Sequence, residues 1–201
     1  MAVAFQASAR TPMRQWLVEM PDSVMPLLTK NDRLDFIDFN DAKMAAVVTN
    51  RMEGRSRMDT LTADYVHFAY TPSTEVEMKL LPVNDSTDVL CMVTTIKAAV
   101  NDSRIAFFDE AWQPLKVSDY MAEPCVEDFR STTTQDDSAR RAWSKMDTFF
   151  RTYHLCAEEA TLKCVLTALD YLSKEDREEV EPYVRQSLNY RWTNGRLVGD
   201  E

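Results

Sequence analysis

The feature that most constrains the fold is a strict alternation of charged and apolar side chains from Glu75 to Leu80. A period of two is typical of a β-strand with one face in the core and the other in water. Turn-forming residues separate this segment from its neighbours, which indicates short connections. Similar strands, some of them apolar on both faces, are predicted at 56–61, 65–70, 89–96 and 105–108. The sequence therefore predicts an antiparallel meander from about residue 45 to about residue 110.

The segment before the meander is predicted to be helical. Pro12 in a first turn favours one helix, and the polar pair at 22–23 is suited to cap a second helix. A third helix is expected over 32–44, capped by Asn31. Its core-facing side chains are expected to be Leu34, Ile37 and Phe39, with Asp35 and Asp38 at the polar margin.

The C-terminal part contains both helical and strand-like patterns. The polar stretch 131–137 is the best linker, and a helix is expected from its end to about Phe150. The stretch 152–172 is compatible with a helix or with two strands around a turn at 157–160. A short helix begins near Ser173, and Asn194-Gly195 predicts a type I′ hairpin, because both residues accept a positive φ.

Composition excludes several classes of function. The chain has 201 residues but only 3 Gly, so no Gly-rich loop can cradle a phosphate. Its net charge of −10 repels a phosphate backbone, which argues against binding to nucleic acid. No apolar run is long enough to span a bilayer, so no membrane span is expected.

The N-terminus carries the main indication of cellular location. Residues 1–9 are apolar and end on Ala7-Ser8-Ala9, and an A-x-A triplet after an apolar run is the pattern of a signal-peptide cleavage site. We interpret this segment as the remnant of a signal peptide, cut after Ala9. The alternative is an Ala-rich terminus without such a role. The first interpretation predicts a periplasmic or extracellular protein.

Few residues are candidates for a catalytic role, and none of them lies in a known catalytic motif. The closely spaced Asp35 and Asp38, and the two histidines, His67 and His154, are the candidates for catalysis. The sequence contains neither HExxH nor GxSxG, and charge runs of this kind are usually solvated helix faces. No metal-ligand spacing and no cofactor motif is present, so no cofactor is predicted.

The four cysteines include one candidate pair. If residues 152–167 form a hairpin centred on Ala160, Cys156 and Cys164 stand directly opposite each other. Such a pair is compatible with a disulfide in an exported protein, although free buried thiols are the alternative.

Several segments together resemble a known family. The run from Met20 through Phe39 (MPDSVMPLLTKNDRLDFIDF) is similar to a family of exported Bacteroidetes proteins of unknown function. The likeness continues at 48–50, 78–86, 112–115, 170–176 and 190–195. It implies export and a strand at 161–167, and it supplies no catalytic residue.

Together these observations predict an α+β protein: N-terminal helices, an antiparallel meander, then a helix–hairpin–helix–hairpin part. The expected division is 1–9 as signal remnant, 10–130 as helices plus meander, and 131–201 as a second α+β unit that is separate or shares the first core. The leading functional hypothesis is a non-enzymatic binding or accessory module of the cell envelope that contacts an unknown protein or envelope ligand. The rival is a hydrolase-type enzyme whose site combines distant Asp and His residues.

Overall fold

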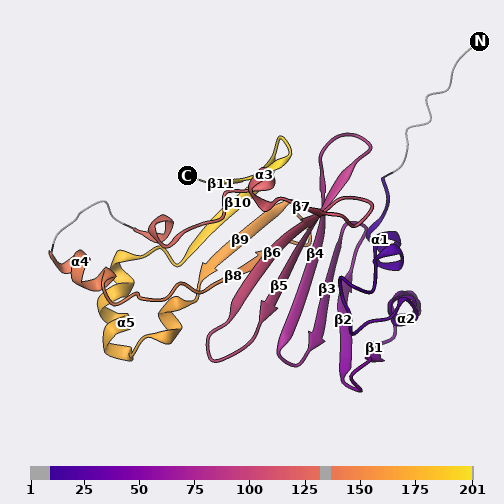
Figure 1. Cartoon of the computed structure of the whole chain (residues 1–201), viewed down its shortest axis with the longest axis horizontal. Helices are drawn as coiled ribbons and strands as arrows, with labels where there is room; N and C mark the ends of the chain where they lie inside the picture. The colour runs from indigo at the N-terminus through magenta and orange to yellow at the C-terminus, as the bar shows by residue number, and fades with distance from the viewer. Residues whose placement is uncertain (1–9, 132–136, 201) are drawn as a thin grey trace, which may run out of the picture.

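The computed structural model describes residues 10–131 and 137–200. These residues form two antiparallel sheets, one of seven strands and one of four, together with short helices, so the predicted α+β class is confirmed (Figure 1). The predicted signal remnant and the cleavage position after Ala9 lie outside the described residues.

Sheet A is the meander expected from the alternating pattern, with its strands neighbouring one another in chain order. Its strands are β1 (Ala46–Thr49), β2 (Arg55–Leu61), β3 (Tyr65–Thr71), β4 (Thr74–Pro82), β5 (Asp88–Ile96), β6 (Asp102–Phe108) and β7 (Pro114–Leu115). Sheet B has the order β11-β10-β9-β8, and its strands are β8 (Arg151–Leu155), β9 (Thr161–Leu166), β10 (Ser187–Thr193) and β11 (Arg196–Gly199). The hairpin between β10 and β11 turns through Asn194 and Gly195, which both have positive φ, as the sequence predicts.

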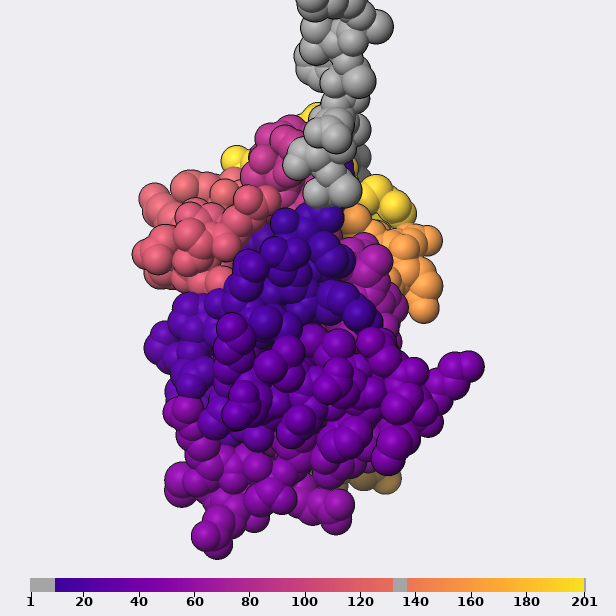
Figure 2. Space-filling view, turned by 90° about the vertical axis from the view of Figure 1, so that its right-hand side faces the viewer, coloured from indigo at the N-terminus to yellow at the C-terminus, as the bar shows by residue number. Residues whose placement is uncertain are grey.

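Four of the five helices lie at two ends of the described part of the molecule (Figure 1). Those labelled α1 (Met13–Glu19) and α2 (Lys30–Asp41) lie beside the first strands of sheet A, and α4 (Asp137–Trp143) and α5 (Lys174–Val180) lie at the opposite end. Figure 2 shows the first end, where the N-terminal helices (indigo) lie against strands of sheet A (purple). The remaining short elements are α3 (Val117–Tyr120) and the 3-10 turns η1 (Val126–Phe129), η2 (Ala168–Tyr171) and η3 (Glu181–Tyr183).

Sheet A separates two hydrophobic clusters. On one face, side chains such as Phe68 and Met78 pack against α1 and α2. On the other face, side chains such as Val93 and Phe107 pack against residues of sheet B. The second cluster therefore contains buried residues from both sides of the polar stretch 131–137.

The N-terminal helices differ from the prediction in three respects. Residues 22–28 form turns instead of a helix, and Thr29, not Asn31, caps α2 through a capping box with Asp32. Leu34, predicted to face the core, is 38% exposed, whereas Arg33 is 1% exposed.

The physical reason is the guanidinium of Arg33. Its N–H groups donate to the carbonyl oxygens of Leu17 and Met20 at the end of α1 and of Leu28 just before α2, so one side chain holds together the two ends of the turn segment. Pro26 also disfavours a helical conformation at the residue before it.

The predicted helix to about Phe150 is also too long, since α4 ends at Trp143. The chain then becomes extended, because the carbonyl oxygen of Phe150 accepts hydrogen bonds from the N–H groups of Thr167 and Ala168. These bonds continue the pairing of sheet B beyond the start of β8.

Sheet B meets sheet A along the free edge of β8. Three backbone N–H groups of this edge donate to side chains of sheet A: Arg151 to Asp102 at 3.2 Å, Tyr153 to Ser103 at 3.2 Å, and Leu155 to Glu77 at 2.6 Å. An unpaired edge is therefore satisfied by side chains that stand on the face of another sheet. This contact brings the outer face of sheet B next to β4.

Candidate functional site

The face of sheet A that is turned toward sheet B carries polar residues on β3 and β4, which alternate with side chains of the helix-side core. On β3, Val66 and Phe68 are fully buried in the cluster beneath the helices, and His67 between them points to the opposite face. On β4, Val76 and Met78 are buried in the same cluster, so Glu77 between them lies on the same face of sheet A as His67. His67 and Glu77 are direct partners in the register of the two strands.

A β-bulge in β2 brings a carboxylate to His67. The register of β2 against β3 shifts between Met58 and Thr60, which leaves Asp59 as the additional residue. Its carboxylate lies 3.3 Å from Nδ1 of His67 and 2.5 Å from Nε of Arg57. The bulge therefore aims Asp59 at the histidine in the adjacent strand.

Glu77 connects the two sheets. One of its oxygens accepts the Leu155 N–H, and the other lies 3.7 Å from Nδ1 of His154. Glu77 therefore contacts His154 of sheet B and is the register partner of His67 on β3.

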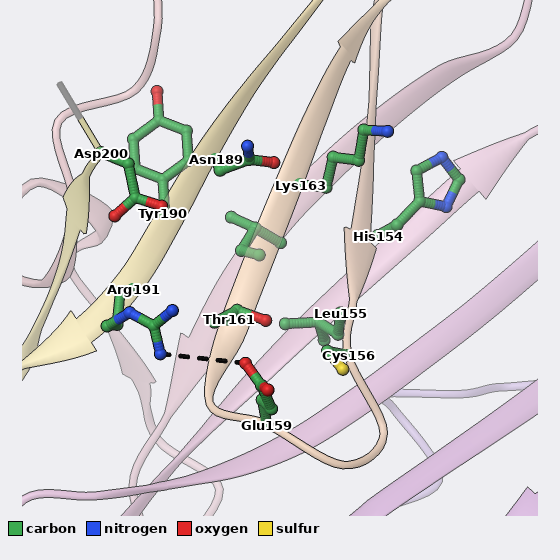
Figure 3. Close-up of a pocket in the computed structure, with 11 residues that line it drawn as sticks. His154, Leu155, Cys156, Glu159, Thr161, Lys163, Asn189, Tyr190, Arg191 and Asp200 are labelled. Carbon is green, nitrogen blue, oxygen red and sulfur yellow. Dashed lines mark ion pairs between the residues drawn. The ribbon is translucent and has the colours of Figure 1, made fainter.

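The polar line continues across sheet B. His154 pairs in register with Lys163 on β9, and Lys163 pairs with Asn189 on β10. Figure 3 shows these side chains on one face of the sheet. We call this set the polar row, and its members are Asp59, His67, Glu77, His154, Lys163 and Asn189.

The part of the polar row on sheet B borders a shallow depression of about 400 Å³ (Figure 3). Arg191 and Glu159 lie at its rim, 3.8 Å apart, and both side chains are largely exposed. His154 is half exposed, and its Nε2 contacts the Thr152 hydroxyl at 3.1 Å. The depression is thus open to solvent and offers hydrogen-bond donors and acceptors of both charges.

This arrangement is better suited to binding an extended ligand than to catalysis at a single centre. Each histidine is paired with a different carboxylate, Asp59 for His67 and Glu77 for His154. Within residues 10–131 and 137–200, no group of three or more His, Cys, Asp or Glu side chains is arranged to hold a metal ion.

The structure does not bring the predicted acidic pair to the histidines. Asp35 and Asp38 are exposed on α2. That helix packs through Phe36 against Phe68, on the face of sheet A opposite to His67. The hypothesis that Asp35 or Asp38 forms a site with His67 is therefore wrong, because sheet A lies between α2 and the His67 side chain.

The predicted opposition of Cys156 and Cys164 is also wrong. Cys164 stands opposite Tyr153, and the last pair of the hairpin is Leu155 with Leu162, so its centre lies between residues 158 and 159 instead of at Ala160. All four cysteines lie in the described residues, and all are free. Burial raises the pKa of the Cys164 thiol to about 12, which keeps it protonated and unreactive at neutral pH.

The sequence does not indicate Asp59 or Lys163 as site residues. The alternation of β4 does place Glu77 on the wet face, and it is the one signal that points to this part of the polar row. The bulge at Asp59 has no marker, because no Gly or Pro occurs within β2.

The comparisons with known proteins agree with the resemblance found in the sequence. The profile of a family described as "Protein of unknown function (DUF3256)" matches residues 4–197. The chain is similar to the solved structure of a domain of an uncharacterized protein from Porphyromonas gingivalis W83. That similarity has a TM-score of 0.83 at 27% identity and covers 96% of this chain and 99% of that chain. No curated protein matches. The chain therefore belongs to DUF3256, a family of proteins of unknown function.

Proposed function

We propose that this protein is an exported, non-enzymatic binding or accessory module of the cell envelope, and that it contacts its partner through the polar row. The observation that carries the proposal is the register that lines up polar side chains of both sheets, from the partly buried His67 and Glu77 to the exposed His154, Lys163 and Asn189. Such a line presents alternating donors and acceptors to an extended ligand, for example a segment of an envelope protein. The location is periplasmic or extracellular.

Export is supported by the cleavage pattern at Ala7-Ser8-Ala9. The test expresses the protein from its own gene in the native host, fractionates the cells and sequences the N-terminus of the isolated protein. The proposal expects a mature chain that begins at Arg10, outside the cytoplasm. Protein found in the cytoplasm with residues 1–9 intact contradicts it.

Binding through the polar row is tested by site-specific photo-crosslinking in the producing cells. A photoreactive amino acid replaces Asn189 in one variant and Asp35, on the helix-covered side of sheet A, in a matched control. Both positions are exposed, so incorporation leaves the fold intact. A discrete adduct from position 189 alone supports the proposal, whereas equal labelling from both positions, or none, contradicts it.

A second candidate function is hydrolysis, and one observation favours it. The carboxylate of Asp59 holds Nδ1 of His67 at 3.3 Å, and a carboxylate orients a general-base histidine in the same way. This version replaces the predicted Asp35 and Asp38 by Asp59. Turnover of ester or peptide substrates that is lost in both His67→Ala and Asp59→Asn, while both variants remain folded, is the result that selects hydrolysis over binding.

A further inference from the structure

A second concave site lies away from the polar row, where the N-terminal segment meets both sheets. It has a volume of about 400 Å³. Its walls include the apolar side chains of Pro12, Leu80, Pro82 and Ala160, and its acidic groups are Asp64 and Asp88. Ala160 belongs to the loop between β8 and β9, so the cleft is lined by residues of sheet A, of this loop and of the N-terminal segment.

Asp88 is the least satisfied group in this cleft. The residue is 6% exposed, and among the described residues its carboxylate accepts no hydrogen bond from a side chain or backbone N–H. Its charged partner in the described chain is Arg10, whose Nη1 remains 3.6 Å away. Burial raises the pKa of Asp88, the nearby Glu110 and Asp64 raise it further, and Arg10 acts in the opposite direction.

The neighbouring charges are engaged elsewhere. Asp64 binds the ammonium of Lys79 at 2.9 Å, and that ammonium also donates to the carbonyl oxygen of Ala157. Arg10 donates through Nη2 to the carbonyl oxygen of Asn84, so its guanidinium is shared between two acceptors. Asp88 therefore retains acceptor capacity that faces a cavity with apolar walls.

We propose that this cleft binds a primary ammonium group carried on an apolar stem, and that the ammonium pairs with Asp88. A compact ammonium brings three donors to a carboxylate that lacks them, and charge-assisted hydrogen bonds of this kind are strong where water is excluded. The stem packs against Leu80 and the two prolines. Arg10, at the rim, is the resident cation that the ligand displaces. This site is independent of the polar row and goes beyond the proposed function.

Isothermal titration calorimetry of the 201-residue chain with n-butylammonium tests the proposal, with n-butanol as the neutral probe of the same stem. We expect measurable binding of the amine and none of the alcohol. Asp88→Asn is expected to weaken amine binding by about tenfold, the size expected for one lost charged hydrogen bond. Asp85→Asn, in the exposed loop before β5, is the matched control and leaves the affinity unchanged.

Arg10→Ala provides a second variant that does not alter a buried group. Removal of the resident cation is expected to tighten amine binding, because Asp88 then has no competing partner. This variant decides the question even if Asp88→Asn does not fold. Weaker or unchanged binding in Arg10→Ala contradicts the displacement of Arg10 and overturns the proposal.

The ammonium has two sources, a free amine or a lysine side chain of a partner peptide. The second arm titrates a short peptide with blocked termini and one central lysine, against the same peptide with acetylated lysine. Binding of the lysine form alone assigns the site to a partner chain, and binding restricted to n-butylammonium assigns it to small amines. If neither probe binds, or if both bind equally to Asp88→Asn, the proposal fails.

Discussion

Arg33 shows how one residue can organise the backbone of a whole segment. Its guanidinium is buried, donates to three backbone carbonyls and pairs with Asp22 at 3.1 Å. The run 20–39, which carries the family resemblance, is thus the segment that encloses this guanidinium. The Arg33 hydrogen bond and the neighbouring Arg51 hold the pKa of Asp22 below its ordinary value, against the effect of burial.

Replacement of Arg33 by methionine is expected to lower the free energy of unfolding by at least about 3 kcal/mol, because three carbonyls then lack a donor and each costs about 1 kcal/mol or more. Urea denaturation monitored by circular dichroism measures the change. Arg14→Ala, which removes an exposed ion pair with Asp41, is the control and is expected to cost less than about 1 kcal/mol. Similar losses in the two variants contradict the role assigned to Arg33.

Asp88 gives a prediction with a definite pH dependence. Its pKa is raised in the folded protein, so the ionised carboxylate opposes folding above that pKa, and the penalty disappears as the pH falls below the ordinary value of 3.8. Asp88→Asn is therefore expected to raise the melting temperature at about pH 7 and to leave it unchanged at about pH 3. Thermal melts of the two proteins at both pH values measure this difference. A variant that is less stable at neutral pH shows that Arg10 outweighs the burial of Asp88.

At the scale of elements, the free edge of β8 determines how the two sheets fit together. Its N–H groups are paired with side chains of β4 and β6 instead of a further strand. Ser103 is central, since its buried hydroxyl accepts the Tyr153 N–H and contacts the Thr95 hydroxyl at 2.8 Å.

Ser103→Ala is expected to lower the free energy of unfolding by about 1–3 kcal/mol, the cost of a buried N–H without a partner. Hydrogen exchange locates the effect. Compared with the parent protein, the exchange rate of the Tyr153 amide is expected to increase more than the rates of amides in the middle of β5. Ser73→Ala, in the exposed loop between β3 and β4, is the control. An unchanged exchange rate of the Tyr153 amide would mean that the free edge of β8 does not depend on the Ser103 side chain.

The elements of sheet A could be predicted from the sequence because their pattern is local. The alternation around Val76 and Met78 identifies the strand and its core face correctly. The prediction that the other face lies in water is wrong at Lys79, which is 1% exposed because its ammonium pairs with Asp64 and with the carbonyl oxygen of Ala157. The error at Leu34 has a different origin, since Arg33 is buried by tertiary hydrogen bonds that periodicity does not detect. The cysteine register failed for a similar reason, because a few residues of turn decide which side chains oppose each other.

At the scale of the whole molecule, the polar row exists only when both sheets are assembled. Asp59 and Asn189 lie at its two ends and are far apart in the sequence, and neither belongs to a motif. His67 and His154 could be singled out as the chain's two histidines, but the approach of His154 to Glu77, the register partner of His67, depends on where β8 crosses sheet A. No local sequence pattern indicates where β8 crosses sheet A. Only the two histidines of the site could therefore be predicted.

The central claim is that the polar row serves binding, and the cross-linking yield from position 189 tests it most directly. We compare this yield in two backgrounds, Lys163→Ala within the row and Lys30→Ala on α2, where both lysines are at the surface. The account predicts at least about a tenfold loss of adduct for Lys163→Ala, as for a residue that dominates an interface, and no loss for Lys30→Ala. Both proteins are expected to keep the parent melting temperature. Equal adduct yields in the two backgrounds would contradict the account.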